Sequence, residues 1–192
     1  MDIVLASASP RRQELLKRLV DNFKIEISNF DEDSVEFQGD IDKHVCDLAE
    51  GKARNILNKV QKDSIVIGCD TVVYLNRKIL GKPINDKDAF EMLRSLSGNV
   101  HKVYSGLVLI NSKTNELIRK SVCTEVKFMN LSEDMILRYI ESGQCNGKAG
   151  AYGIQDNAAI FVENINGCYY NVVGLPLNTS GSDAVPALLR IL

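Results

Sequence analysis

The spacing of hydrophobic residues along the chain predicts an alternation of strands and helices. Short apolar or alternating runs, which favour strands, lie at residues 3–6, 23–28, 64–75, 79–80, 101–111 and 116–129. Apolar residues at intervals of three and four, which favour amphipathic helices, recur at residues 10–20, 41–60, 85–98 and 132–141. Because strands alternate with helices, we expect an α/β fold in which a mixed sheet carries helices on its faces.

Four further features complete the predicted fold. Residues 64–75 are apolar on both faces, so we expect a buried central strand there. The Asn166-Gly167 pair is typical of a type I′ turn and predicts a last hairpin, and a short helix is expected within residues 174–192. A chain of 192 residues has the size of one domain, and we expect residues 1–192 to form a single domain with two lobes and no separable linker.

Composition limits the classes of partner and the compartment. The formal net charge of −2 argues against a broad basic surface for nucleic acids. There is no apolar run of 18 residues and no charged leader followed by an apolar segment, so we expect neither a membrane partner nor export. The five cysteines are odd in number and widely spaced, which suits reduced thiols in a cytoplasmic protein.

Two adjacent arginines stand at the start of the first predicted helix. Ser9 is the expected N-cap and Pro10 the first helical residue, which places Arg11 and Arg12 in the first turn. The helix dipole favours acids at this end, so the arginines have the locally unfavourable sign. With the free N–H groups of the turn they predict an anion site, above all for phosphate. Alternatively, both arginines point into water or pair with acids elsewhere.

Two charged residues interrupt apolar surfaces. Lys52 projects from the centre of the apolar stripe of residues 41–60, where it either reaches water along its stem or meets a negative partner. Asp70 lies within the apolar strand, where a lone carboxylate is costly unless it is paired, protonated or bound to a metal. Its place near a strand end favours a ligand site, and a salt bridge to a core lysine is the structural alternative.

The remaining motifs narrow the chemistry. Glu32 belongs to an acid-rich loop, and such loops are more often only solvated turns. Lys82 belongs to a Gly-Lys-Pro loop and is by itself equally well explained as an ordinary loop lysine. The sequence has no P-loop, cysteine phosphatase loop, dinucleotide fingerprint or serine elbow, and His44 and His101 are too few for a histidine-rich metal site. We expect both histidines to be structural. Cations for phosphate and hard oxygen ligands remain, the combination that Mg²⁺-assisted phosphoryl chemistry requires.

Eight motifs together resemble the Maf family of nucleoside triphosphate pyrophosphatases. In chain order they are LASASPRRQELL, FDED, LAEGKA, IGCDTVV, GKP, LSGNVHKVYSG, AGAYGIQD and NVVGLPL. Any one of them is weak, but their order and spacing over nearly the whole chain are highly specific. The resemblance implies an elongated mixed sheet with flanking helices and a cleft between two lobes, similar to the inosine triphosphate pyrophosphatases, and it implies a homodimer.

The resemblance also implies an activity and its residues. Family members hydrolyse a nucleoside triphosphate to the monophosphate and pyrophosphate, by attack of water at the α-phosphorus, with Mg²⁺, Mn²⁺ or a similar ion. Matched by position, the residues that would hold the triphosphate are Ser7, Arg11, Arg12, Lys52 and Lys82. Glu32 and Asp70 would hold the metal, and Asp70 would also orient or deprotonate the attacking water. Asp70, Glu32, Lys52 and Lys82 are therefore the expected catalytic residues.

Three positions match the branch of the family that acts on dTTP and UTP. These positions are Arg12, Thr71 and Gln155, and the Gln155 amide is both donor and acceptor, as a pyrimidine edge requires. Modified pyrimidine nucleotides are further candidate substrates. Asp156 departs from the family pattern, which usually has glycine there, and the tail lacks the usual leucine- and lysine-rich pattern. The alternative functions are a nucleotide-binding regulator of septum formation without significant turnover, and a purine-directed pyrophosphatase.

Overall fold

A computed structural model describes residues 1–61 and 63–177, which form a seven-stranded mixed sheet with helices. The strands are β1 (Asp2–Leu5), β2 (Lys24–Ile25), β3 (Ser64–Leu75), β4 (Lys78–Leu80), β5 (Val100–Asn111), β6 (Leu117–Phe128) and β7 (Val162–Asn166). The α-helices are α1 (Pro10–Leu16), α2 (Ile41–Leu57), α3 (Asp86–Leu96), α4 (Glu133–Glu141) and α5 (Tyr169–Val173). Three short 3₁₀ helices are η1 (Glu32–Ser34), η2 (Ala149–Ala151) and η3 (Asn157–Phe161). The predicted α/β class with a mixed sheet is confirmed.

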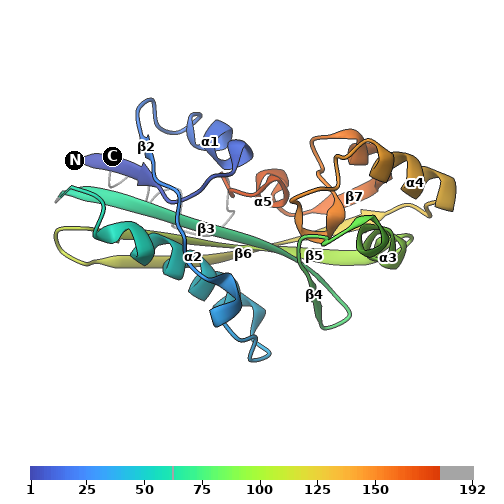
Figure 1. Cartoon of the computed structure of the whole chain (residues 1–192), viewed down its shortest axis with the longest axis horizontal. Helices are drawn as coiled ribbons and strands as arrows, with labels where there is room; N and C mark the ends of the chain where they lie inside the picture. Colours follow the sequence, from blue (N-terminus) through green and yellow to red (C-terminus); the bar gives the residue numbers. More distant parts are fainter. Residues whose placement is uncertain (62, 178–192) are drawn as a thin grey trace. The chain divides into compact units, whose positions relative to one another are not determined.

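The sheet mixes parallel and antiparallel pairs. Its strand order is β2-β1-β3-β5-β6-β7, and β4 pairs with β3 beside this path (Figure 1). β1 is parallel to both β2 and β3, whereas β4 is antiparallel to β3 and β7 is antiparallel to β6. As predicted from its apolar sequence, β3 is buried along nearly its whole length. β3 therefore provides the interior strand on which Asp70 lies.

The described chain divides into two compact units. The first unit comprises Met1–Asp70, Ser105–Val122 and the chain from Gly174 onward, as far as the structure describes it. The second comprises Thr71–Tyr104 and Cys123–Val173. The boundary falls within β3, so Asp70 and Thr71 are consecutive residues that belong to different units. The expectation of a single domain over residues 1–192 stays a prediction.

The first unit is built on the close packing of α2 against the sheet. A Cβ atom at Gly68 of β3 would overlap the Ala49 carbonyl oxygen, and one at Gly106 of β5 would overlap backbone atoms of Val45. Both glycines thus let the α2 backbone approach the strands more closely than any side chain would allow (Figure 1). Alanines at the contact, such as Ala53, are fully buried. This short distance between helix and sheet brings the centre of α2 next to the middle of β3.

The core of the second unit is rich in aromatic rings. Phe128 is fully buried and makes edge-to-face contacts with His101, Tyr152 and Phe161, at centroid distances of 4.9, 4.9 and 6.0 Å. Tyr139 of α4 packs on Phe161 at 5.2 Å. The rings join strands β5 and β6 to the segment that precedes β7, so a part of the chain with little regular structure is packed as firmly as the strands.

Helix starts agree with the sequence. Ser9, Asp40, Asn85 and Ser132 cap α1 to α4, each with a side-chain oxygen that accepts a backbone N–H of the first turn. The expected stop signals are also present, because Gly98 and Gly143 have positive φ values of 68° and 71° after α3 and α4. Two helices are shorter than predicted: α1 ends at Leu16 and α2 at Leu57.

The strand predicted at residues 23–28 is wrong in extent and burial. β2 contains only Lys24 and Ile25, which pair with Val4 and Leu5 of β1. Ile25 and Ile27 are 44% and 59% exposed rather than half-buried. β2 is the edge strand of the sheet and has only two residues, so the alternating pattern is not continued as a longer strand.

The last predicted hairpin is also wrong. β7 pairs with β6 rather than with the segment that follows Gly167, and that segment forms the helix α5. Its aromatic and β-branched residues favour a strand locally, but the fully buried Asn171 amide donates to the Val103 carbonyl at 2.9 Å and to Thr124 Oγ1 at 3.0 Å. Tertiary hydrogen bonds therefore override local propensity. The short helix expected within residues 174–192 stays a prediction, because residues 178–192 lie outside the described residues.

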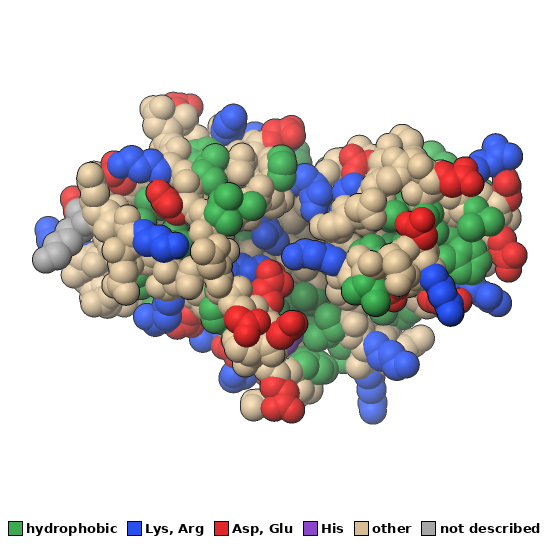
Figure 2. Space-filling model, viewed as in Figure 1, with side chains coloured by type: hydrophobic (Ala, Val, Ile, Leu, Met, Phe, Trp, Pro, Cys, Tyr) green, Lys and Arg blue, Asp and Glu red, His purple; other side chains and the backbone are tan. Residues whose placement is uncertain are grey.

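The surface agrees with the modest net charge. Acidic and basic side chains lie side by side over much of the face shown in Figure 2. In the two described ranges, no helix combines the length and the apolar character that crossing a bilayer requires.

Candidate active site

The turn between β1 and α1 fixes the side chain of Arg12. Ser9 Oγ accepts the Arg12 backbone N–H at 3.5 Å, which confirms the predicted cap. Ser7, only 7% exposed, accepts hydrogen bonds from Ser9 N at 3.2 Å and from Arg12 Nη1 at 3.4 Å. Arg12 Nε donates to the Gly174 carbonyl at 2.9 Å. These partners orient the guanidinium. Arg11 lies in the same turn and is half-buried.

Lys52 and Asp70 form a buried ion pair. Lys52 is 9% exposed on the inner face of α2, and Asp70 is 5% exposed on β3. Lys52 Nζ lies 2.5 Å from Asp70 Oδ1 and 3.0 Å from Glu32 Oε1. One ammonium group therefore contacts two carboxylates, one buried and the other half-exposed. The sequence predicted a negative partner for Lys52 and a cation for Asp70. The structure shows that Lys52 and Asp70 are partners of one another.

The loop before α2 is held where Glu32 reaches Lys52. The ring of Phe30 lies so close to Gly51 that a Cβ atom there would overlap it. One turn further along α2, Asn55 Oδ1 accepts the Asn29 backbone N–H at 3.0 Å. A glycine within a helix is destabilising, and its place beside Lys52 is explained by this ring contact. Glycine and asparagine on one face of α2 thus seat the acidic loop beside the ammonium.

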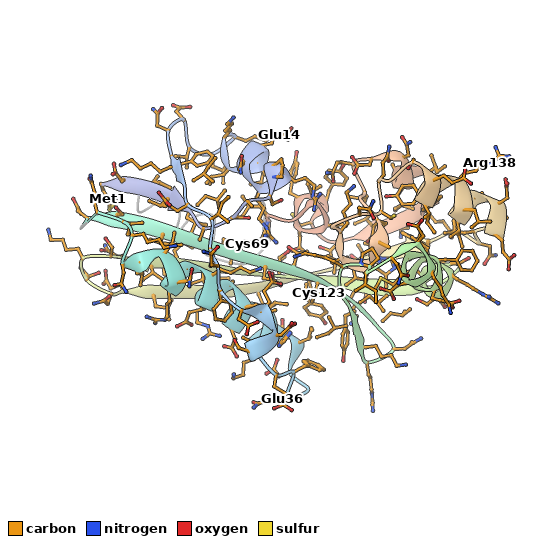
Figure 3. All side chains as sticks on the ribbon, in the orientation of Figure 1. Met1, Glu14, Glu36, Cys69, Cys123 and Arg138 are labelled. Carbon is orange, nitrogen blue, oxygen red and sulfur yellow. The ribbon has the colours of Figure 1, made fainter. Side chains whose placement is uncertain are left out.

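Cys69 is influenced by the charges of both the arginine and the ion pair. It is fully buried, precedes Asp70 on β3, and is labelled in Figure 3. Its thiol lies 3.2 Å from the Gly174 carbonyl oxygen, which also accepts from Arg12. Burial raises the pKa of Cys69, whereas the positive charges of Arg12 and Lys52 lower it and the negative charge of Asp70 raises it. All three charges therefore lie near one sulfur atom.

Lys52, Asp70 and Glu32 form a cluster with two carboxylates and one ammonium group, which leaves an excess of negative charge for a cation. A structural salt bridge, the alternative for Asp70, needs one acid and one base, whereas Lys52 contacts both Asp70 and Glu32. The described ranges contain no group of three or more His, Cys, Asp or Glu residues placed to hold a metal ion. Mg²⁺ does not need such a group, because it commonly binds one or two carboxylates together with waters and substrate phosphates. Glu32 and Asp70 are therefore the residues of this cluster that could hold such an ion.

The second unit holds Thr71, Lys82 and Gln155 on segments that contact one another. Thr71 is half-buried on β3, and Lys82 is exposed in the loop that follows β4. The Gly150 N–H donates to the Gly81 carbonyl at 2.9 Å, which joins the loop of Lys82 to the loop of Gln155. Gly150 also packs on Val73 of β3 so closely that a Cβ atom would overlap its side chain. The backbone thus brings the three segments together.

The loop that carries Gln155 has an unusual backbone. Gly150 and Ala151 have φ values of 66° and 61°, and the left-handed conformation is rare for alanine. Tyr152 is 5% exposed, and its hydroxyl forms a 2.8 Å hydrogen bond with His101 Nε2. Burial lowers the pKa of His101 to about 4 and raises that of Tyr152. His101 is therefore neutral and structural, as predicted. Gln155 itself is exposed, next to the buried Ile154.

Sequence reasoning missed the residues that position the predicted ones. Gly174 anchors Arg12 through a backbone carbonyl, which leaves no signal in residue type. Gly81 likewise acts through its carbonyl. Gly51 did carry a signal, because a glycine within a long amphipathic helix, directly before a buried lysine, indicates close contact with another segment.

Comparison with known proteins agrees with the resemblance. The family model of the Maf-like protein matches residues 2–182. A dTTP/UTP pyrophosphatase of Clostridium botulinum (strain Okra / Type B1) is 57% identical over 183 residues, or 94% of each chain. A dTTP/UTP pyrophosphatase of Clostridium novyi (strain NT) is 54% identical over 178 residues, or 93% of each chain. Among solved structures, the Ham1 protein of Staphylococcus aureus matches with a TM-score of 0.43 and 15% identity, over 67% of this chain and 72% of that chain.

The family match covers almost all of the described residues, including the β1–α1 turn, the ion-pair cluster and the loop of Gln155. The Clostridium relatives span nearly the full length of this chain at more than half identity. The chain therefore belongs to the Maf-like family.

Proposed function

We propose that this chain hydrolyses nucleoside triphosphates, and pyrimidine triphosphates in particular, to the monophosphate and pyrophosphate. The observation that carries the proposal is the buried Lys52, which holds Asp70 and Glu32 together beside the oriented guanidinium of Arg12. Phosphate-binding cations next to hard oxygen ligands are what phosphoryl chemistry with a divalent ion requires. The family's relatives named dTTP/UTP pyrophosphatase support the same activity.

Arg12 and its neighbours would bind the phosphates. The Arg12 side chain is already fixed by Ser7 and Gly174, so little conformational entropy remains to be lost when an anion binds. Arg11 follows the N-cap in the same turn, and the family resemblance assigns Lys82 to phosphate binding. Cations aimed at the β- and γ-phosphates stabilise the charge that grows on departing pyrophosphate more than the charge of the ground state.

Glu32 and Asp70 would hold a divalent cation, Mg²⁺ or Mn²⁺. When bound, the ion supplies Lewis-acid polarisation of the phosphate oxygens and lowers the pKa of a water molecule. Asp70 would orient the attacking water and accept its proton, a role supported by the burial of its carboxylate and by its contact with Lys52. The water oxygen then bonds to the α-phosphorus while the bond to the bridging oxygen breaks, and that oxygen leaves with the electron pair on pyrophosphate.

Base recognition would involve Thr71 and Gln155. Gln155 is exposed, and its amide offers both a donor and an acceptor to the edge of thymine or uracil. A cytosine edge presents an amino group where uracil has a carbonyl, so a fixed amide discriminates between them. Family resemblance also places Arg12 in this selective set.

A substrate panel in isotopically labelled water tests the proposal. Pure protein is incubated with dTTP, UTP, CTP, GTP and ITP, each with Mg²⁺ or Mn²⁺, and the products are separated. We expect dTTP and UTP to give monophosphate and pyrophosphate, with the heavy oxygen in the monophosphate. Heavy oxygen in pyrophosphate would place the attack at the β-phosphorus and contradict the mechanism, and release of orthophosphate alone would contradict the bond choice.

The same panel separates the alternatives. Tight nucleotide binding without metal-dependent turnover of any triphosphate would favour the regulator of septum formation. Preferential turnover of ITP and GTP would favour the purine-directed enzyme. The homodimer remains a prediction, which the mass of the protein in solution tests directly.

A further inference from the structure

An ion pair closes the loop that carries Gln155. Lys148 and Asp156 stand on either side of residues 149–155, and Lys148 Nζ lies 2.9 Å from Asp156 Oδ2. The two side chains are 12% and 29% exposed, in contrast to typical surface pairs. The Lys148 ammonium also donates to the Gln144 carbonyl oxygen, beyond the end of α4. Because the pair is largely shielded from water, salt screens it less than an exposed pair.

The first half of the loop is held by other contacts. Gly150 bonds to Gly81, the Tyr152 hydroxyl bonds to His101, and the Gly153 N–H donates to the Tyr139 hydroxyl at 3.3 Å. These bonds fix the backbone as far as Gly153. The second half, with Gln155, needs an anchor of its own.

Asp156 supplies that anchor. Its backbone N–H donates to the Gly153 carbonyl at 3.0 Å, which closes a turn with Ile154 buried at 4% exposure and Gln155 outside. A Cβ atom at Gly153 would overlap Asp156 Oδ2 and lie within 3.0 Å of two Lys148 side-chain carbons. The ion pair therefore packs directly on the turn, and movement of either partner moves the backbone on which Gln155 stands.

We propose that Lys148 and Asp156 are positioning residues that fix Gln155 for recognition of the pyrimidine base. The proposal rests on the proposed function, because it assigns a role within base recognition. It also explains the departure from the family motif: glycine, the usual residue at position 156, has no side chain to pair with Lys148. The pair therefore adds a constraint on the loop that the usual family motif does not contain.

Steady-state kinetics of two single variants and their combination test the proposal. Asp156→Asn keeps the size of the side chain and removes its charge, and Lys148→Met removes the ammonium. For each we expect KM for dTTP and UTP to rise about tenfold with kcat within about twofold of wild type, because binding geometry changes and chemistry does not. The preference for UTP over CTP should fall by a similar factor. The double variant should be no worse than either single variant, because both remove the same interaction.

Two controls separate positioning from general stability. Lys148→Arg keeps the pairing and should keep KM near the wild-type value. Asp134→Asn breaks the exposed pair between Asp134 and Arg138 on α4 of the same unit and should change no kinetic parameter. Thermal melts of all variants show whether a kinetic change follows a loss of folded protein.

The outcomes separate this proposal from the proposed function. Wild-type turnover of UTP together with an unchanged KM and UTP-to-CTP preference in Asp156→Asn overturns the positioning role alone. A loss of kcat that parallels a lower melting temperature also overturns it, because that is the signature of a structural pair. If wild type hydrolyses no pyrimidine triphosphate, the proposed function fails, and the positioning role fails with it.

Discussion

The two units hold their functional side chains in different ways. In the first, Lys52 and Asp70 lie on a long helix and a central strand, and their charged groups are buried. In the second, Lys82 and Gln155 lie on loops and are exposed, while backbone hydrogen bonds and left-handed residues set the path of the chain. The first arrangement fixes side-chain atoms directly, whereas the second fixes the backbone and leaves the side chain to meet its ligand.

This difference predicts unequal consequences of substitution. A substitution that removes one partner of a buried ion pair should strongly destabilise the protein and also abolish activity, because the remaining charge is buried without compensation. An exposed loop residue affects ligand contact and little else. Substitutions of the buried Lys52 and Asp70 should therefore change kcat and stability together, and substitutions of the exposed Gln155 should change KM and substrate preference.

The largest expected effect follows from loss of the Asp70 carboxylate. Asp70→Asn keeps the shape of the side chain but removes the proposed proton acceptor and metal ligand, so we expect kcat to fall by about 10²-fold or more. Initial rates with dTTP at saturating metal measure the effect. Asp2→Asn is the matched control, since Asp2 pairs with Lys24 on the surface of the same unit. Full activity of Asp70→Asn would remove Asp70 from the mechanism.

Acid should weaken the second unit through His101. Its pKa is lowered from 6.5 to about 4 in the folded protein, because burial disfavours the charged ring. The unfolded chain therefore binds the proton first, and stability is full above pH 6.5 and falls as the pH drops toward 4. The size of the loss from this group is about 3 kcal/mol. Urea unfolding at a series of pH values measures it.

The variant His101→Phe checks the assignment. It removes the titrating ring and the hydrogen bond to Tyr152, so its stability should be lower at neutral pH but flatter between pH 6.5 and 4. An unchanged slope in this variant would assign the acid sensitivity to other groups.

The next largest effect tests how α2 is seated in the first unit. In Gly68→Ala the new methyl group meets the Ala49 carbonyl and the Ala53 Cβ, so the helix must move away from β3. We expect a loss of about 2 kcal/mol in unfolding free energy, typical of overpacking, together with a lower kcat because Lys52 moves relative to Asp70. Gly81→Ala, which has open space around the added Cβ, is the stability control. Equal unfolding free energies for the two variants would contradict this account of the packing.

The same contrast decides what could be read from the sequence. Lys52 and Asp70 were predictable because charge on an otherwise apolar face violates periodicity, and the caps at Ser9 and Ser132 follow from local chemistry. The ion pair between Lys52 and Asp70 needed the structure, because periodicity gives the direction of a side chain but not its partner.

Much less of the second unit could be predicted from the sequence. Lys82 and Gln155 came only from the family resemblance, since an exposed loop residue has no pattern to violate. The strand predicted after Gly167 is a helix, because the buried Asn171 depends on partners more than forty residues away. The segment around Ile25 shows a different error: its alternating pattern predicted a half-buried strand, but the strand is short and Ile25 is exposed. Local sequence patterns do not predict contacts between residues that lie far apart in the chain.

The smallest expected effect compares the two serine caps. Ser132 Oγ accepts the Met135 N–H at 3.2 Å in an exposed part of α4, so Ser132→Ala should cost about 1 kcal/mol of stability and leave the kinetics unchanged. Ser9→Ala removes a longer bond to Arg12 N, 3.5 Å, and should cost no more stability. It should nevertheless raise KM about threefold, because the same turn positions the Arg12 guanidinium and small misplacements weaken phosphate contacts. Chemical unfolding and UTP kinetics on both variants test the contrast. An increased KM in Ser132→Ala, or an unchanged KM in Ser9→Ala, would show that cap loss does not act through Arg12.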